Sequence, residues 1–163
     1  MTDEPVARVV VAAVGSEFRR DDGAGPAVLA RVRGVLGDAE VLGPLTSPLQ
    51  LLGAWDRAGL AVIVDAVRDD GGEPGAVRVV ELGVSPSDEP GSPVRRSSSH
   101  GMGVVDAFRL SCALGTAPAR VVLVGVTGEC FDDGIGLSPS SSSAVARAAR
   151  LVVGLVAAES AAR

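Results

Sequence analysis

The chain has 163 residues, of which 47% are hydrophobic, so we expect one globular domain spanning residues 1–163 with a substantial core. All 15 basic residues are Arg and there is no Tyr, which excludes a P-loop lysine, a Schiff-base lysine and a lysine or tyrosine acid–base group. The formal charge of −5 disfavours a nucleic-acid partner, because binding a duplex requires an electropositive face.

Short Val-rich runs alternate with longer helical patterns along the chain. This alternation predicts an α/β fold built around a mainly parallel sheet. The segment 69–77, "DDGGEPGAV", indicates a tight turn, so the strand after it is expected to be antiparallel or at an edge. The predicted strands are residues 8–14, 39–42, 60–65, 77–81 and 120–127.

Two helices are predicted in the first half of the chain. The first covers residues 23–35, where Val and Leu recur at helical spacing. The second follows Thr46 or Ser47, with Pro48 in its first turn. Its inward-facing residues are expected to be Leu49, Leu51 and Leu52.

Two more helices are predicted in the second half, over residues 102–114 and from Ser138 onward. Ser138 is a good N-cap, and the following Pro139 suits the first helical position. The serine tract 140–143 is expected to form a solvated first turn. The stretch 83–99 has no core pattern, which is typical of a functional lid or a disordered loop.

We expect a cytoplasmic protein with no membrane partner. No uninterrupted apolar stretch reaches about 18 residues, and the first residues are acidic where a secretory signal would be basic. Cys112 and Cys130 are too far apart for a Cys-x-x-Cys motif, so we expect two free thiols. Cys112 lies in an apolar helical pattern and is interpreted as a core residue.

Three titratable residues are candidates for a site. Asp22 follows the first predicted strand, Asp65 ends the apolar run "LAVIVD", and His100 is the one histidine in the chain. Because the carboxyl ends of parallel strands share one edge of a sheet, these three side chains can converge there. A buried, unpaired carboxylate is costly, so Asp65 requires a partner.

The glycine-spaced turn "GSEFRRDDGAG", residues 15–25, resembles turns that hold phosphate on backbone amides. Here a phosphate at 4 Å from Asp22 would be repelled by about 1 kcal/mol per charge pair in water and by about 4 kcal/mol at an effective dielectric constant of 20. Two carboxylates and one imidazole instead suit a divalent transition metal and leave coordination positions open. The alternative is that Asp21 and Asp22 only cap the first helix.

Several segments together resemble the hydrogenase maturation protease family, in its order and spacing, from residue 8 to about residue 155. They are "VVVAAVGSEFRRDDGAGPAVLARV", "VIVDAV", "GGEPGAV", "SSHGMGVVDAFRL", "VVLVGVTGE" and "GIGLSPS". The resemblance implies a three-layer α/β sandwich of the phosphorylase/hydrolase-like kind, with a twisted five-stranded sheet and helices on both faces.

The resemblance also implies an activity: an endopeptidase that removes a C-terminal extension from the precursor of a NiFe-hydrogenase large subunit after nickel insertion. The family's metal-contacting residues fall on Asp22, Asp65 and His100, which are therefore the candidate metal and catalytic residues. In similar members the nickel is thought to be carried by the substrate, so the site of the purified protein is expected to be empty or to hold another divalent metal.

Two departures from the family's pattern concern Ser16, where many members have Asn, and the segment 42–52. The family often has an Asp-containing, glycine-rich turn before a Thr in that segment, whereas here Thr46 is retained within "LGPLTSPLQLL". Because the segment is associated with substrate recognition, the identity of the cognate precursor stays open.

Two mechanisms and three other functions are left open by the sequence. Asp65 can activate water as general base beside the metal, or the acids can act by an aspartic-type mechanism. A non-catalytic maturation chaperone or metal-sensing binding protein would use the same pocket. Nucleotide binding is disfavoured by the missing Lys. A Ser-His-Asp hydrolase is disfavoured because no Gly-x-Ser-x-Gly elbow occurs.

Overall fold

The computed structural model describes residues 7–68, 71–83 and 103–163. One sheet holds the strands β1 (Val9–Val14), β2 (Glu40–Leu45), β3 (Leu60–Arg68), β4 (Val77–Leu82) and β5 (Arg120–Gly128), in the order β2-β1-β3-β5-β4. β1 pairs in parallel with β2 and β3, and β3 pairs in parallel with β5. β4 is antiparallel to β5 and lies at the edge of the sheet, which confirms the sequence prediction.

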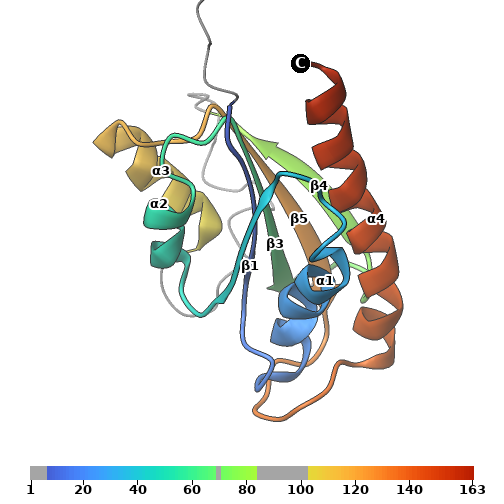
Figure 1. Cartoon of the computed structure of the whole chain (residues 1–163). Coiled ribbons are helices and arrows are strands. Elements are labelled where there is room, and N and C mark those ends of the chain that lie inside the picture. The colour runs from blue at the N-terminus through green and yellow to red at the C-terminus, as the bar shows by residue number, and fades with distance from the viewer. Residues whose placement is uncertain (1–6, 69–70, 84–102) are drawn as a thin grey trace, which may run out of the picture.

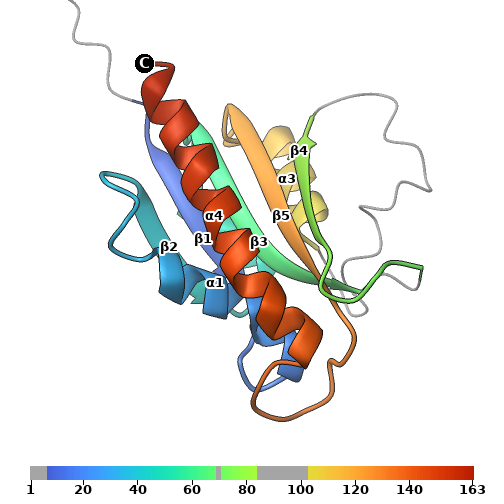
Figure 2. The same cartoon turned by 90° about the vertical axis from the view of Figure 1, so that its right-hand side faces the viewer.

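Helices cover both faces of this sheet. The helices α1 (Ala24–Val32) and α4 (Pro139–Ala161) lie on one face, and α2 (Leu51–Ala54) and α3 (Val104–Leu114) lie on the other (Figure 1). The view turned by 90° shows α4 crossing in front of the strands, with α3 behind them (Figure 2). The predicted three-layer α/β architecture is therefore confirmed.

The three central strands, β1, β3 and β5, bury both of their faces, which explains their near-continuous apolar sequences. Alternate residues of β1, β3 and β5 point to opposite sides and join two separate apolar clusters, one under α1 and α4 and one under α2 and α3. In the second cluster the indole N–H of Trp55 donates to Ser111 Oγ at 2.8 Å, and the Trp55 ring meets Phe108 edge to face. The polar end of this large side chain is thus satisfied inside the core.

The second helical segment differs in part from its prediction. Ser47 caps a short 3-10 turn, Pro48–Gln50, which leads into α2, so the predicted start and the position of Pro48 are confirmed. Leu51 is fully buried, as expected, but Leu49 is 48% exposed. Leu49 lies in the 3-10 turn, before the helix presents an inward face, so its predicted inward orientation is wrong.

The start of α4 is as predicted: the hydroxyl of Ser138 accepts from the amide of Ser141, and Pro139 occupies the first turn. The expectation that the whole tract 140–143 is solvated is wrong at Ser141, which is fully buried one turn before the buried Ala144. Its hydroxyl has no hydrogen-bond partner.

Within the described ranges, α4 is the helix that is long and apolar enough, by length and composition, to cross a membrane. In this fold its apolar side chains instead pack against α1 and the sheet.

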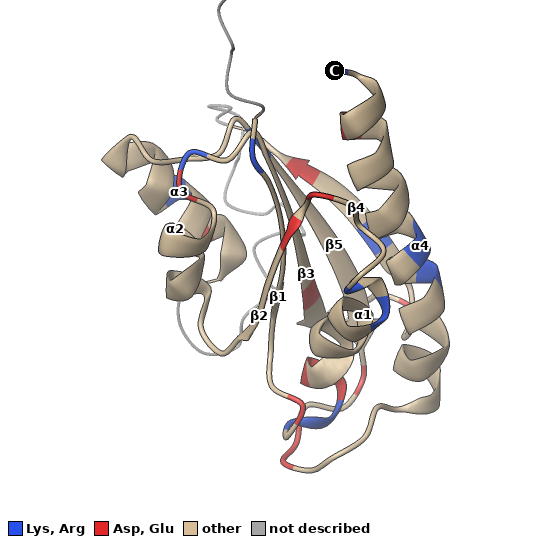
Figure 3. Ribbon diagram, viewed as in Figure 1, with Lys and Arg blue, Asp and Glu red and all other residues tan. Residues whose placement is uncertain are grey.

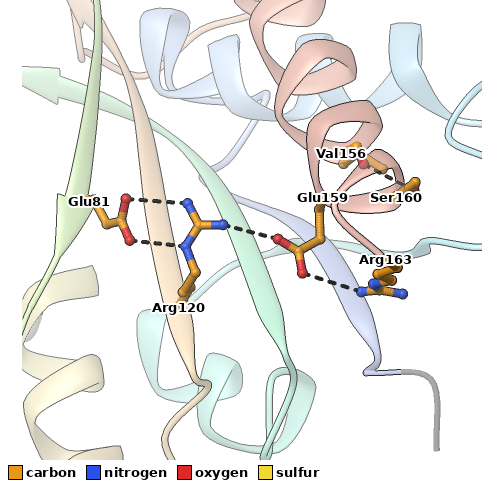
Figure 4. Close-up of polar contacts among 6 residues, drawn as sticks. All are labelled: Glu81, Arg120, Val156, Glu159, Ser160 and Arg163. Carbon is orange, nitrogen blue, oxygen red and sulfur yellow. Dashed lines mark hydrogen bonds and ion pairs between the residues drawn. The ribbon is translucent and has the colours of Figure 1, made fainter.

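The charged side chains at the amino end of β5 form a network that joins three elements (Figure 4). Arg120 donates to both oxygens of Glu81 on β4, at 3.0 and 3.3 Å, and to Glu159 on α4 at 3.0 Å. Glu159 also pairs with Arg163 at 3.6 Å. The network links β4 and the last turns of α4 to the amino end of β5. It therefore lies at the opposite end of the sheet from the carboxyl end of β5.

The order of the strands creates a switch point between β1 and β3. The chain leaves β1 by way of α1 to reach β2 on one side, whereas after β3 it continues to β4 and β5 on the other side. In open α/β sheets, ligands bind in the crevice at the carboxyl ends of the strands beside such a point. Figure 3 shows acidic segments there, on β3 and at the start of α1.

Candidate functional site

Asp65 lies near the carboxyl end of β3, at the switch point. Its neighbours in the ladder are Val14 of β1 and Gly125 of β5. The side chain is 7% exposed. Burial, and then the charge of Asp22, raise the pKa of Asp65 well above its usual value, although a hydrogen bond from the backbone of Ala66 opposes this. The structure thus holds a carboxyl group in surroundings that favour its protonated form until a compensating charge arrives.

Asp22 belongs to the 3-10 turn Arg20–Gly23 between β1 and α1. Its Oδ2 accepts a hydrogen bond from the amide of Ser16 at 2.8 Å. Gly15 has a φ of +137°, and a Cβ at this position would collide with the carbonyl oxygen of Asp22. Because the bond to Asp22 comes from the main chain, the Ser16 side chain is not needed to hold it. The departure from Asn at position 16 therefore leaves this contact intact.

Strand pairing brings the turn that carries Asp22 to Asp65: Val14 is the ladder neighbour of Asp65, and a Cβ at the next residue, Gly15, would lie 3.3 Å from Asp22 Oδ1. The separation of Asp22 and Asp65 in the sequence is bridged by the pairing of β1 with β3. His100 lies outside the described residues, so the structure brings together two of the three predicted residues. Over the described ranges, no group of three His, Cys, Asp or Glu side chains is placed to hold a metal ion.

Asp21 has a different role from its neighbour. It is completely buried, and its carboxylate accepts hydrogen bonds from the amides of Glu129, Cys130 and Ser138 and from the Ser138 hydroxyl, at 2.7–3.1 Å. Burial raises the pKa of Asp21, but the four hydrogen bonds together lower it by more than burial raises it. The net pKa is therefore below the usual value. Asp21 is therefore held as a carboxylate at the amino end of α4, where the helix dipole also favours a negative charge.

These contacts bear on the alternative that Asp21 and Asp22 only cap the first helix. The N-cap of α1 is Gly23, and no side chain makes a capping bond there. Asp21 binds the start of α4 instead, and Asp22 binds the amide of Ser16. Neither acid therefore caps α1 by a side-chain hydrogen bond, because donors outside the helix engage both carboxylates.

Sequence reasoning identified Ser138 as an N-cap but missed its bond to Asp21, which spans 117 residues. No local sequence pattern predicts that the turn with Asp21 contacts the loop before α4. The pair of adjacent acids, Asp21 and Asp22, was the one feature of the sequence that pointed to it. The loop that connects β5 to α4 also contains Cys130, whose Sγ lies 3.8 Å from Asp132 Oδ2. Cys112 and Cys130 are both free, as expected, and Cys112 packs against the second apolar cluster.

The segment 42–52 borders the site through its main chain. The carbonyl of Leu45 accepts from the amide of Gly15 at 2.9 Å, so the end of β2 lies beside the turn that carries Asp22. Beyond it, Gln50 Oε1 accepts from the amides of Thr46 and Ser47, at 2.9 and 3.1 Å. The segment that departs from the family's pattern is thus a closed, internally bonded turn at the rim of the site.

Comparison with known proteins identifies the family of this chain. The family model described as hydrogenase maturation protease matches residues 37–155. The hydrogenase 2 maturation protease of Escherichia coli K12 is 26% identical over 136 residues, which cover 82% of this chain and 80% of that protein.

Solved structures show the same fold. The maturating endopeptidase HybD from E. coli superposes with a TM-score of 0.71 at 21% identity, covering 91% of both chains. A NiFe hydrogenase maturation protease from Thermococcus kodakarensis gives a TM-score of 0.69 at 25% identity, covering 91% of this chain and 99% of that one. With the family model matching most of its length, this chain is a peptidase that belongs to the hydrogenase maturation protease family.

Proposed function

We propose that this protein is the endopeptidase that removes the C-terminal extension of a nickel-loaded NiFe-hydrogenase large-subunit precursor in the cytoplasm. Nickel bound in the docked precursor would take ligands from Asp22, Asp65 and His100. The observation that carries the proposal is the pair of acids at the switch point: Asp65 is buried beside Val14, and the turn that follows Val14 carries Asp22.

The electrostatics of the pair favour a cation. A second negative charge beside Asp22 is unfavourable, so Asp65 favours its protonated form, and a divalent cation between the two acids would stabilise both as carboxylates. Carboxylate and imidazole are suitable ligands for a divalent transition metal. The acids therefore select for the metal-loaded precursor, since a nickel-free precursor brings no positive charge to stabilise an ionised Asp65.

Asp65 is the better candidate for activating water at the scissile carbonyl. Its burial raises its pKa, and a carboxylate with a raised pKa is a stronger base than an ordinary one. Asp22 keeps one oxygen engaged by the Ser16 amide, which fixes its orientation and leaves the other oxygen for the nickel of the substrate. In this division of labour Asp22 recognises the substrate, and Asp65 contributes to both recognition and chemistry.

The test is incubation with nickel-loaded and nickel-free precursor, followed by mass measurement of the precursor. We expect loss of the C-terminal extension from the nickel-loaded form alone, and no loss with Asp22→Asn, Asp65→Asn or His100→Ala. Asp38→Asn, at an exposed position remote from the described site, is the matched control and should cleave normally. Undiminished cleavage by the three site variants would refute the proposal. Stable binding of the precursor without any change in mass would instead indicate a non-catalytic chaperone.

A further inference from the structure

Asp21 is a buried charged residue for which the proposed reaction has no task. It lies next to Asp22 in the sequence but points away from the site, into the start of α4. Its Oδ2 accepts from the Glu129 amide at 2.9 Å, the Cys130 amide at 3.1 Å and the Ser138 hydroxyl at 2.8 Å. Its Oδ1 accepts from the Ser138 amide at 2.7 Å.

The main chain around Asp21 is fastened to the same loop. The amide of Asp21 donates to the carbonyl of Cys130 at 2.9 Å, and the amide of Arg20 donates to the carbonyl of Gly134 at 3.0 Å. The amide of Gly134 in turn donates to the carbonyl of Phe18 at 2.8 Å. We call residues 16–22 the acidic turn and residues 129–138 the anchoring loop. Side-chain bonds of Asp21 and main-chain bonds of Phe18, Arg20 and Asp21 thus join them into one unit.

Close packing leaves this unit little room to shift. A Cβ at Gly128, the last residue of β5, would lie 2.8 Å from the Cβ of Asp21. Arg20 adopts a φ of +48°, a conformation that a non-glycine residue keeps only where its surroundings enforce it. The bonds of Gly134 to Phe18 and to Arg20, together with the bond from the Asp21 amide to Cys130, supply that enforcement.

Asp22 depends on the same turn for its own position. Its amide donates to the carbonyl of Arg19 at 3.1 Å, and its carboxylate accepts from the Ser16 amide. Both bonds are made within residues 16–22, so the place of the Asp22 carboxylate is set by the place of this turn. A turn that was free to move could carry the carboxylate away from Asp65. Anchorage at the adjacent residue opposes this motion.

We propose that Asp21 is a positioning residue: by fastening the acidic turn to the anchoring loop, it holds the Asp22 carboxylate toward Asp65 before the metal-loaded precursor docks. The inference rests on the proposed function for its catalytic consequence. It concerns the geometry of the free protein, however, and that geometry can be measured without any substrate.

The main test compares Asp21→Asn with Val152→Ala. The Asn variant has nearly the same shape as Asp, but it replaces an acceptor by an amide that faces hydrogen-bond donors. Val152→Ala is the control for a general loss of stability, because it shortens a buried side chain of α4. Val152 lies about 21 Å along the helix from Ser138. We expect kcat/KM for the nickel-loaded precursor to fall about 10- to 100-fold in Asp21→Asn and to stay within about twofold in Val152→Ala.

Amide hydrogen exchange supplies the readout that a merely structural role would not move. In Asp21→Asn the side-chain NH2 takes the place of one carboxylate oxygen, so either the amide of Ser138 or the amides of Glu129 and Cys130 lose their acceptor and should exchange faster. The amide of Ser16, which binds Asp22 and not Asp21, should also exchange faster and change its chemical shift.

An unchanged Ser16 amide in Asp21→Asn would overturn the inference even if the loop amides respond, and so would cleavage by this variant within about twofold of wild type. Failure of the wild-type protein to cleave any precursor would refute the proposed function instead. In that case the Ser16 amide would still decide whether Asp21 positions Asp22.

Discussion

Gly25 provides a stringent test of how α1 is seated on the sheet beside the site. It is buried in the first turn of α1, and a Cβ there would lie 2.9 Å from the carbonyl oxygen of Val14 and 3.0 Å from that of Val64. Both oxygens belong to strands in the middle of the sheet, so neither can move aside cheaply. Gly25→Ala should therefore push α1 away from β1 and β3.

The magnitude follows from two opposing effects. Replacing Gly by Ala in a helix is favourable by up to about 1 kcal/mol, because Ala loses less backbone entropy on folding. Overpacking a close contact costs about 1–3 kcal/mol. We expect Gly25→Ala to lower the free energy of unfolding by about 1–2 kcal/mol. Because Val64 precedes Asp65, cleavage of the nickel-loaded precursor should also slow.

Gly154 is the matched control. It is exposed on α4, and nothing lies within 4 Å of a Cβ built there. The same substitution should therefore raise the free energy of unfolding by about 0.5–1 kcal/mol. Urea unfolding followed by circular dichroism measures both variants against wild type. A Gly25→Ala protein as stable as wild type, or a destabilised Gly154→Ala protein, would refute the reasoning.

Further predictions concern the charge network, the cap of α4 and a buried hydroxyl. Hydrogen bonds from Arg120 lower the pKa of Glu81, so the contribution of the pair is present above the unfolded-state pKa and is lost as the pH falls through the folded value. Glu81→Gln should lower the free energy of unfolding in urea by up to about 1 kcal/mol at pH 7 in low salt, since the pair is exposed. The loss should be smaller below about pH 4 or in 1 M salt. A difference that does not depend on pH would contradict this. Ser138→Ala removes both an N-cap and a donor to Asp21, so it should lower the free energy of unfolding by about 2–4 kcal/mol. The control Ser142→Ala, at an exposed position, should change it by less than about 0.5 kcal/mol. The hydroxyl of Thr127 is buried without a hydrogen-bond partner. Thr127→Val should therefore leave the free energy of unfolding unchanged or raise it by up to about 1–2 kcal/mol. Thermal and urea unfolding measure this, and a destabilised variant would contradict it.

The sequence alone predicted the framework of this protein. Apolar runs with β-branched residues predicted the strands within a few residues, since a strand buried on both faces needs side chains of this kind wherever it lies in the sheet. Ser138 with Pro139 predicted the start of α4, because capping depends on neighbours in the sequence. An acid within so apolar a strand made Asp65 a candidate site residue, and the ordered motifs indicated the family.

Tertiary structure decided how the two neighbouring acids of the β1–α1 turn are used. Asp21 and Asp22 are indistinguishable by residue type and local pattern. In the structure, however, Asp21 is buried and hydrogen-bonded at the start of α4, whereas Asp22 lies beside Asp65. The exposure of Leu49 and the burial of Ser141 likewise depend on which elements pack over them. Local periodicity reports which face of an element is apolar. It carries no information about contacts such as that of Asp21 with Ser138, which form between loops far apart in the chain when the sheet brings their ends together.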